Sequence, residues 1–394
     1  MGALMKVRDR MSKEKPFKGL TIGLALHVTK ETGVLIRTLR DGGAKVAITG
    51  CNPLSTQDDV AAALAEEDGV LVWAYKGESK EDYYKFLNAV IDTEPNITID
   101  DGCDLVTEIH TKHPGLIPNI IGGCEETTTG IIRLRAMEEE GVLKYPMIAV
   151  NDNRTKHLFD NYYGTGQSTM DGILRSTNIL FAGKTVVIGG YGSCGKGCAL
   201  RAKGLGANVI VTEVNAFNAL QAATDGYRVM PMAEAAELGD IFITVTGNKH
   251  IFRMEHFEKM KDGAILANSG HFDNEIDMEA LERNAKRKRR VRHYLDEYLM
   301  KSGRAIYVAG EGRLVNLASA EGHPSEVMSL SFCGQTLACE YLVKNKGKLQ
   351  SEVITLPNEI DDEIAKMQLD AIGVKYDQMT TEQVAYQNEW REGT

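Results

Sequence analysis

The chain has 394 residues, of which 43% are hydrophobic and 25% are charged, and its formal net charge is −10. This length predicts two or three domains, and the composition is typical of a globular enzyme. The acidic balance excludes a general nucleic-acid binder, because no global basic field would gather phosphates. Neither a signal peptide nor an apolar run long enough to span a membrane is recognisable, so we expect a cytoplasmic protein with no membrane partner.

Cysteine usage points away from disulfide bonds and metal centres. The seven cysteines are odd in number, and no two of them form a C-x-x-C pair. We therefore expect reduced thiols and predict no resident metal.

Strands and helices alternate through residues 19–150. Apolar, β-branched runs such as GLTIGLAL, AKVAIT and NITIDD are typical of strands, whereas TKETGVLIRTLRDGG has helical spacing. This alternation predicts a parallel sheet with helices on both faces.

A second α/β series begins with KTVVIGG and continues through ANVIVTEV, DIFITVTG, AILANSG and AIYVAG. We therefore predict two doubly wound parallel-sheet domains joined near residues 161–168, and a helical C-terminal tail. The expected boundaries are 1–166 with a returning segment 324–355 for the substrate domain, 167–323 for the cofactor domain, and 356–394 for the tail.

The run KRKRRVRH at residues 286–293 is strongly basic. Acidic residues flank it on both sides, which favours a solvated helix face over a nucleic-acid site.

The stretch GGYGSCGKG contains G-x-G-x-x-G as Gly190, Gly192 and Gly195, between a predicted strand and a predicted helix. In that setting the first glycine permits a tight turn, the second permits close approach of a pyrophosphate, and the third lets helix meet strand. The phosphates then face the helix N-terminus. Glu213 ends the next strand, 18 residues after Gly195, where a carboxylate accepts hydrogen bonds from a ribose and disfavours a 2′-phosphate. The pattern predicts a Rossmann domain that binds NAD.

Polar clusters follow several other predicted strands, where open parallel sheets bind ligands. Each has an ordinary structural alternative, such as a turn, a helix cap, a buried histidine or an ion pair between positions i and i+4. A metal site built from His27, Asp101 and Glu126 is conceivable, but no spacing requires it. The cluster residues are His27, Thr29 and Glu31; Asp100, Asp101 and Asp104; Glu125, Glu126 and Thr127–Thr129; Asn151, Lys156, Asp160 and Asn161; His271; and Asn316, His323 and Met328.

Nine motifs in this order resemble the S-adenosylhomocysteine hydrolase (adenosylhomocysteinase) family, from about residue 5 to about residue 385. They are HVTKET, STQDDVAAAL, DDGCDL, CEETTTGI, VNDNRTKHLFDN, GYGSCGKG, TEVNAFNALQA, NSGHFDNEID and EGRLVNLASAEGHPSEVM. A set of nine ordered motifs is far more specific than any one of them.

The resemblance implies a reversible hydrolysis of S-adenosylhomocysteine to adenosine and homocysteine, a step of the methyl cycle. In that family, bound NAD oxidises the ribose 3′-hydroxyl, the ketone acidifies the C4′ hydrogen, homocysteine is eliminated, water adds, and the ketone is reduced again. NAD is therefore a recycled prosthetic group, and the protein positions and polarises the sugar. The resemblance also implies a homo-oligomer, in the form of a tetramer.

The resemblance assigns provisional roles to the polar clusters. Lys156 is a candidate base for the 3′-hydroxyl if burial or cationic neighbours lower its pKa. The acid and base roles cannot be divided among the catalytic candidates from sequence. These candidates are His27, Asp101, Lys156, Asp160 and His271. The substrate contacts implied are Thr29, Glu31, Asp101, Glu126, Asn151, Lys156, Asp160, His323 and Met328.

For the cofactor, the resemblance adds threonines beneath the nicotinamide and residues near its carboxamide. The full set of expected NAD contacts is Thr127, Thr128, Thr129, Asn161, Gly190, Gly192, Ser193, Cys194, Gly195, Glu213, Asn218, Ser269, Gly270, His271, Asn316 and His323.

Base recognition in the family uses the threonine and the acid of H-x-T-x-E, here Thr29 and Glu31. A carboxylate accepts from the exocyclic amine of adenine and repels the O6 carbonyl of hypoxanthine, which favours the adenosyl over the inosyl substrate. The alternatives are an S-inosylhomocysteine hydrolase, a two-domain NAD-dependent dehydrogenase that consumes free NAD, and a non-catalytic NAD-binding regulator.

This sequence departs from the family pattern at three places. Many members end in a short tail with Lys and Tyr that contacts the NAD of a neighbouring subunit. This sequence ends in WREGT instead, so we expect NAD to exchange more readily. Members usually begin with an extra helical segment, whereas this sequence starts close to KPFKG, which begins at residue 15. Glu321 and Glu326 replace residues that are apolar in many members, and Glu326 lies near the expected hinge.

Overall fold

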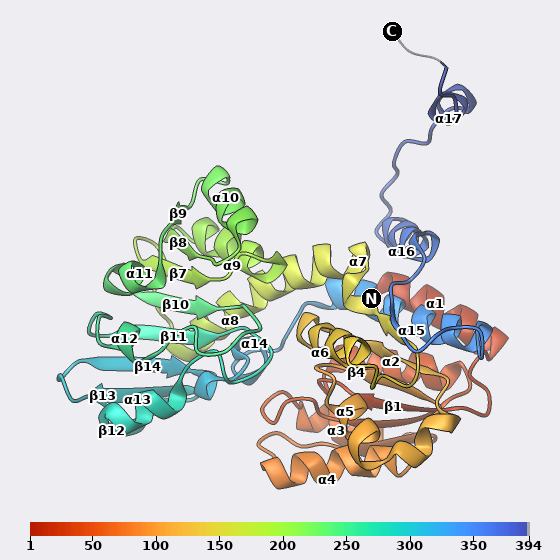
Figure 1. The fold of residues 1–394 in the computed structure, drawn as a ribbon, viewed down its shortest axis with the longest axis horizontal. Coiled ribbons are helices and arrows are strands. Elements are labelled where there is room, and N and C mark those ends of the chain that lie inside the picture. Colours follow the sequence, from red (N-terminus) through yellow and green to blue (C-terminus); the bar gives the residue numbers. More distant parts are fainter. Residues whose placement is uncertain (392–394) are drawn as a thin grey trace.

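The computed structural model describes residues 1–391 and contains two α/β units, each built on its own sheet (Figure 1). The first sheet has the order β15-β6-β5-β4-β1-β2-β3, and every pairing in it is parallel. Its strands are β1 (Thr21–Ala25), β2 (Lys45–Thr49), β3 (Val70–Trp73), β4 (Ile97–Asp100), β5 (Gly122–Glu125), β6 (Met147–Ala149) and β15 (Val353–Ile354).

Helices cover both faces of this sheet and bury two apolar clusters. One cluster packs around Leu4, Ile36 and Leu337, and the other around Leu87, Ile109 and Leu134. Their burial supplies the main stabilisation of the unit. The helices that follow these strands are α2 (Lys30–Asp41), α3 (Asp58–Ala65), α4 (Lys80–Ile91), α5 (Asp104–Lys112), the 3₁₀ turn η1 (Pro114–Asn119) and α6 (Thr128–Glu139), and α1 (Gly2–Glu14) precedes them.

Strand β5 is not apparent in the sequence pattern, because it begins with two glycines. A Cβ on Gly123 would lie 2.3 Å from Thr98 Oγ1 and 2.6 Å from Met147 Sδ, so only glycine fits between these neighbouring strands. The requirement is close packing, which a propensity-based prediction does not detect.

The second sheet has the order β12-β13-β14-β11-β10-β7-β8-β9. Its pairings are parallel except at β13, which runs antiparallel to both β12 and β14. The strands are β7 (Thr185–Gly189), β8 (Asn208–Thr212), β9 (Arg228–Val229), β10 (Ile241–Thr244), β11 (Ala264–Asn268), β12 (Ala285–Arg292), β13 (Leu295–Met300) and β14 (Ala305–Ala309). The helices are α9 (Ser193–Gly204), α10 (Ala216–Thr224), α11 (Met232–Leu238), α12 (Met254–Phe257), α13 (Met278–Asn284) and α14 (Val315–Ala318), with the 3₁₀ turn η4 (Gly310–Gly312) before α14.

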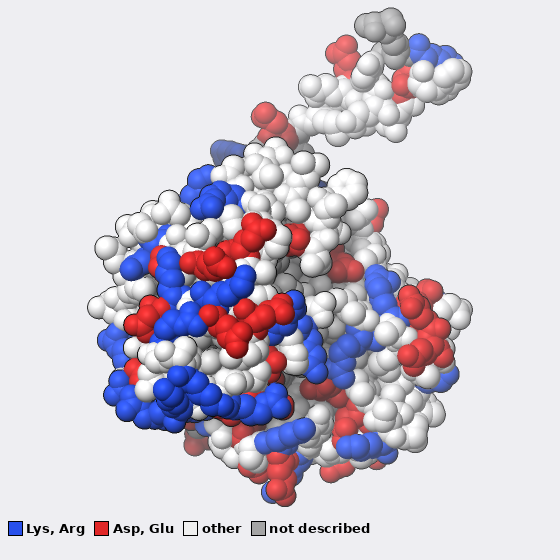
Figure 2. Space-filling model, turned by 60° about the vertical axis from the view of Figure 1, so that its left-hand side comes forward, with Lys and Arg blue, Asp and Glu red and all other residues white. Residues whose placement is uncertain are grey.

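The prediction of a helix face for the basic run was wrong, since residues 285–292 form the edge strand β12. Carboxylates on β13 and nearby elements explain the difference: Arg289 Nε lies 2.7 Å from Glu297 Oε1, and Lys288 Nζ lies 2.8 Å from Glu282 Oε1. Figure 2 shows Lys and Arg gathered low on this unit with acidic side chains beside them. Charged side chains on an exposed edge oppose pairing with another sheet.

The chain crosses between the two units twice. The first crossing begins with the short turns η2 (Val150–Asp152) and α7 (Arg154–Lys156) and continues through the π-helix η3 (His157–Gly164) and α8 (Thr165–Thr177). The second crossing leads into α15 (Ser325–Lys344), which packs on the first unit before β15 pairs with β6. In Figure 1, the yellow helical segment at α7 and α8 runs between the units.

Glycines bring the first crossing directly against helix α9 of the second unit. A Cβ on Gly197 would lie 1.9 Å from the carbonyl oxygen of Tyr162, and one on Gly166 would lie 2.6 Å from the carbonyl carbon of Gly197. The two backbones therefore touch without intervening side chains.

Helix α16 (Asn358–Ala371) also packs on the first core, through the fully buried Ile364. Beyond it, the segment that contains α17 (Thr381–Gln387) extends away from the rest of the molecule (Figure 1), and Tyr376, Met379 and Trp390 on either side of this helix are exposed. The last three residues of the expected WREGT tail lie outside the described residues. Among the helices described, none is long and apolar enough to cross a membrane.

Asp361 of α16 caps the short helix α7. Its buried carboxylate accepts hydrogen bonds from the backbone N–H groups of Arg154 and Thr155, at 2.7 and 3.2 Å, and from the Thr155 hydroxyl. We expect Asp361→Ala to lower the free energy of unfolding by about 1–3 kcal/mol, because it leaves buried donors without an acceptor. Urea denaturation followed by circular dichroism measures this change.

The adjacent Asp362 is the matched control, since its side chain is 60% exposed. Asp362→Ala should change the free energy of unfolding by less than about 0.5 kcal/mol. Equal effects from both variants would contradict a capping role for Asp361.

Candidate active site

A cavity of about 1220 Å³ lies between the two units, and side chains from both line it. The carboxyl ends of both parallel sheets open onto it: His27, Asp101 and Glu126 follow strands of the first sheet, and Gly190 and Ser269 follow strands of the second. This is where open α/β sheets bind ligands. Of the predicted site residues, those on the cavity wall are His27, Thr29, Asp101, Glu126, Thr127, Thr128, Thr129, Asn151, Lys156, Asp160, Asn161, Gly190, Gly192, Ser193, Cys194, Glu213, Asn218, Ser269, Gly270, His271, Asn316, His323 and Met328.

Two predicted site residues do not lie on the wall. Gly195 packs inward, where a Cβ would stand 2.1 Å from the carbonyl oxygen of Gly190, so it joins helix to strand. Glu31 is buried at 5% exposure in the first turn of α2, behind Thr29, which caps that helix and does face the cavity.

The glycine loop has the geometry that a dinucleotide requires. Gly190 has φ +104°, which favours glycine, and a Cβ on Gly192 would meet nothing within 4 Å. Helix α9 begins at Ser193 with no side-chain cap, so its first N–H groups remain available to an anion. The loop therefore fits the pyrophosphate of NAD.

Glu213 is held in place at the end of β8 by backbone hydrogen bonds. Its carboxylate accepts from Tyr191 N and Val214 N, both at 2.7 Å, and from Asn215 N at 2.9 Å. The side chain also lines the cavity, where a carboxylate suits the hydroxyls of an adenosine ribose.

The residues that we expect near the nicotinamide come from several elements of both units. Ser269 Oγ lies 2.6 Å from Thr169 Oγ1 and 3.5 Å from Asn316 Oδ1. Asn151 Nδ2 donates to Thr128 Oγ1 at 3.0 Å. These contacts provide fixed hydroxyl and amide groups on both sides of the cavity.

Lys156 is the centre of a buried polar cluster on the first crossing. Its Nζ lies 3.0 Å from Asp160 Oδ2 and donates to Asn161 Oδ1 at 2.8 Å and to Asn151 Oδ1 at 3.1 Å. Asp160 Oδ1 also lies 2.5 Å from His323 Nδ1, which comes from the second crossing. Both crossings therefore meet at one carboxylate.

The charges in this cluster support one another. Burial alone would lower the pKa of Lys156, but the carboxylates of Asp160 and Glu126 outweigh burial and raise it. Burial alone would raise the pKa of Asp160, but His323 and Lys156 hold it well below its usual range. The lowered pKa that would make Lys156 a base is thus not produced by its protein neighbours, and Lys156 is a cation that donates hydrogen bonds.

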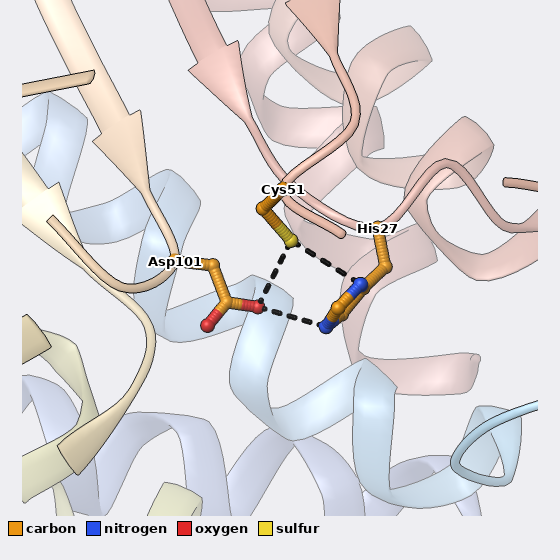
Figure 3. A group of neighbouring side chains, drawn as sticks. All are labelled: His27, Cys51 and Asp101. Atoms are coloured by element: carbon orange, nitrogen blue, oxygen red, sulfur yellow. Dashed lines mark hydrogen bonds and ion pairs between the residues drawn. The ribbon is translucent and has the colours of Figure 1, made fainter. Parts of the chain in front are cut away.

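A second cluster contains His27, Cys51, Asp101 and His271, and Figure 3 shows the first three of these side chains. His27 Nε2 lies 3.3 Å from Asp101 Oδ2, and His271 Nδ1 lies 3.5 Å from Asp101 Oδ1. Burial lowers the pKa of His27 to about 4, although Asp101 opposes this shift, so its imidazole is neutral near pH 7 and can accept a proton. Two histidines around one carboxylate can move protons in either direction.

The carboxyl groups beneath the second cluster are deeply buried. Burial raises the pKa of Asp100 to about 7, although the backbone N–H of Val106 opposes the shift. Burial likewise raises the pKa of Glu125, and Asp100 and Asp101 add to it. Glu125 Oε1 accepts from Gly102 N at 2.9 Å, which supports the loop that carries Asp101.

Glu126 is bound by helix α15 rather than by the second cluster. It accepts a hydrogen bond from Ser331 and one from Gln335 at 2.5 Å, and its Oε1 lies 3.6 Å from Lys156 Nζ. Ser331, Gln335 and Cys51 cannot be recognised as neighbours of these groups from the sequence, because each lies on an element whose local pattern carries no site signal.

The structure and cavity define an NAD-binding α/β enzyme with a Rossmann unit and a second parallel-sheet unit. A family model described as S-adenosyl-L-homocysteine hydrolase matches residues 1–114, and one described as S-adenosyl-L-homocysteine hydrolase, NAD binding domain, matches residues 161–322.

Similar proteins extend the match to the full length. An S-inosyl-L-homocysteine hydrolase of Methanocaldococcus jannaschii is 60% identical, over 100% of this chain and 94% of that protein. Adenosylhomocysteinases of Aquifex aeolicus and Thermosynechococcus vestitus are 58% and 57% identical over 100% of this chain, and over 94% and 92% of those proteins. The chain belongs to the S-adenosyl-L-homocysteine hydrolase family.

The predicted family, the fold class of two α/β units and the use of NAD are therefore confirmed. The roles of individual site residues and the domain boundaries stay predictions.

Gly190→Ala tests the cofactor loop. Its φ of +104° strains any L side chain, and a Cβ would lie 3.0 Å from Thr246 Cγ2 and 3.4 Å from the carbonyl oxygen of Val245. Strain of about 1–2 kcal/mol weakens NAD binding about tenfold or more. The NAD content of the purified protein and calorimetric titration with NAD⁺ measure this loss. Gly204→Ala, at the end of the helix that follows this loop, has open space around its Cβ and should bind NAD normally.

Glu78 is a buried carboxyl near the second cluster, and neither oxygen has a hydrogen-bond partner. Burial, with a smaller effect of Asp82, raises its pKa to about 7. A raised carboxyl pKa contributes stability at low pH that is lost as the pH rises through 4.5 to 7. Glu78→Gln should therefore match the parent at pH 5 and be more stable by up to about 3 kcal/mol at pH 8.

Urea denaturation at the two pH values tests this expectation. Glu81→Gln, on the exposed start of α4, should show no such pH-dependent gain. A Glu78→Gln protein that is less stable than the parent at pH 8 would show that the carboxylate is bound to a cationic partner.

Proposed function

We propose that this enzyme catalyses the reversible hydrolysis of S-adenosyl-L-homocysteine to adenosine and L-homocysteine. One observation carries the proposal: a single cavity is lined by a dinucleotide loop, by the Lys156–Asp160 pair and by the His27–Asp101–His271 group. An enzyme that only oxidised an alcohol would need the dinucleotide loop and the Lys156–Asp160 pair. The third group adds proton transfer at another carbon, which elimination and hydration require.

The residues of the first cluster suit the ribose hydroxyls. Asp160 and Asn161 accept or donate hydrogen bonds, and the Lys156 ammonium stabilises negative charge that develops on the 3′-oxygen. When bound, NAD supplies a reversible oxidant for that carbon. Since Lys156 is cationic between two carboxylates, its role is to hold and polarise this oxygen, and its proton can leave only after the charges around it change.

The second cluster suits the steps at C4′ and C5′. The Asp101 carboxylate can take the C4′ proton once the neighbouring carbon is a ketone. Neutral His27 can accept a proton from water, and His271 can donate one to the leaving thiolate. Helix α15 supplies Glu126 with two hydrogen bonds, so this acid is positioned to bind the ribose edge rather than to shuttle protons.

The adenosyl substrate is favoured over the inosyl one, although relatives with both names are similar to this chain. Thr29 lies on the cavity wall, and the Glu31 carboxylate belongs to the same helical turn. Glu31 itself does not line the cavity, so the proposal requires its carboxylate to turn toward the bound base. There it would accept from an exocyclic amine and repel a carbonyl, which would separate the two bases by about 10²-fold.

We also propose a homotetramer in the cytoplasm, a substrate domain of residues 1–166 and 324–355, and a cofactor domain of residues 167–323. The exposed apolar residues of the projecting segment, among them Tyr376 and Trp390, support contact with another copy.

Thiol release tests the function directly. The purified protein is incubated with S-adenosylhomocysteine and, separately, with S-inosylhomocysteine, with no NAD added. We expect free thiol from the adenosyl compound and no net NADH, because the cofactor is recycled. Lys156→Met should slow release by about 10²-fold or more, whereas Arg154→Met on the exposed side of the same turn should not.

Each other outcome points to a different function. Release from the inosyl compound alone would keep the mechanism and overturn the assignment of the base. NADH that accumulates with added NAD⁺ would indicate a dehydrogenase. No thiol from either compound, with or without NAD⁺, would contradict the hydrolase and favour a regulator.

A further inference from the structure

Three side chains of the second cluster have the donor atoms and the spacing of a metal site. His27, Cys51 and Asp101 each offer one ligand atom, and these atoms all lie within 4.8 Å of one another. We infer that they bind a soft divalent cation such as Zn²⁺, and that an ion bound there inhibits the enzyme. The second part rests on the proposed function.

The sheet topology explains why the three residues meet. Strands β4, β1 and β2 are neighbours, and their ends are in register, with Ala25 opposite both Thr49 and Asp100. His27 and Cys51 follow their strands by two residues and Asp101 by one. The three side chains therefore stand side by side at the carboxyl edge of the first sheet, as Figure 3 shows.

The measured separations match a tetrahedral ion. Cys51 Sγ lies 3.2 Å from His27 Nδ1 and 3.7 Å from Asp101 Oδ2, whereas the 3.3 Å contact of His27 with the same oxygen is made by Nε2. An ion takes only one of these ring nitrogens, and one ligand atom from each residue lies within 4.8 Å of the other two. Zinc bonds of about 2.0–2.3 Å at tetrahedral angles put neighbouring ligand atoms about 3.3–3.7 Å apart. Small rotations of these side chains would be enough to complete the site.

The kinds of donor select the ion. One thiolate, one imidazole and one carboxylate suit zinc, whereas magnesium and calcium prefer oxygen ligands alone. Asp101 Oδ1 is buried without a hydrogen-bond partner, so the carboxylate has unused capacity to accept. Ser55 Oγ lies 2.8 Å from His27 Nδ1, a contact that orients the imidazole ring.

Three protein ligands leave a fourth position, and that position faces the cavity, since His27 and Asp101 both line it. An ion there would occupy the lone pairs through which these two residues take up protons. It would also stand where the substrate sulfur has to pass. Inhibition should therefore be reversible by a chelator and weaker at high substrate concentration.

The sequence alone suggested Glu126 as the third ligand, together with His27 and Asp101. In the structure Glu126 is held by Ser331, Gln335 and Lys156, and Cys51 occupies the third place instead. Cys51 has no assigned part in the reaction, so it can be replaced without removing a catalytic group.

The test begins with direct binding, which does not depend on turnover. Protein with its NAD is freed of metal by dialysis against a chelator, and Zn²⁺ is titrated against a chromogenic chelator. We expect one ion per chain, and Co²⁺ in its place should give a thiolate-to-cobalt charge-transfer band. Cys51→Ser should weaken Zn²⁺ binding at least about tenfold and abolish the band.

Cys194→Ser is the matched control, because Cys194 is a thiol of the same cavity on the cofactor side. It should leave Zn²⁺ affinity and the cobalt band unchanged. Cys51→Ala repeats the test without a hydroxyl, and circular dichroism establishes that each variant is folded.

Adenosine release, measured chromatographically, then tests inhibition. Zn²⁺ should inhibit the parent and a chelator should restore it, whereas Cys51→Ser, measured against its own rate in metal-free buffer, should resist Zn²⁺. Equal binding by the parent and both Cys51 variants, or no binding by the parent, would overturn the metal site. Inhibition of the parent and Cys51→Ser at the same Zn²⁺ concentration would overturn the inhibitory role.

A parent that binds Zn²⁺ through Cys51 but hydrolyses neither thioether would contradict the proposed function and leave the metal site standing.

Discussion

The contact between Asp160 and His323 is the constraint on which the cavity depends. Asp160 lies on the first crossing between the units, and His323 lies on the second, just before helix α15. Their atoms approach to 2.5 Å in a site where both Asp160 and its partner Lys156 are almost fully buried. A buried carboxylate is costly to leave without its hydrogen-bond partners, so the Asp160–His323 contact fixes the two crossings relative to each other and with them the two walls of the cavity.

Much of the architecture follows from local sequence signals. The alternation of strand and helix patterns predicts two parallel sheets, and the glycine loop with Glu213 predicts the cofactor half, because each depends on neighbours in the sequence. Strand β5 is missed because close packing against Thr98 and Met147, rather than β-propensity, selects its glycines. The basic run is misassigned because Glu297 and Asp296, which lie on a partner strand, stabilise it as an edge strand.

In the candidate site, too, contacts between neighbours in the sequence can be predicted, whereas contacts between distant residues cannot. Lys156 and Asp160 belong to one motif, and their proximity can be predicted from a spacing of four residues. Their partner His323 is more than 160 residues away, and its place beside Asp160 depends on the path of the second crossing. The direction of the Lys156 pKa shift likewise depends on Glu126, which only the folded chain brings close. Cys51 joins His27 and Asp101 through strand order, which no local pattern specifies.

The glycine contact between Tyr162 and Gly197 ties helix α9, whose N-terminus fits the cofactor phosphates, to the crossing that carries Lys156 and Asp160. Backbones in direct contact cannot shift independently, because no flexible side chain lies between them to absorb the movement. The two ligand sites are therefore thermodynamically linked. If bound NAD raises the affinity for substrate, bound substrate raises the affinity for NAD by the same factor. NAD is then bound most tightly while substrate occupies the cavity.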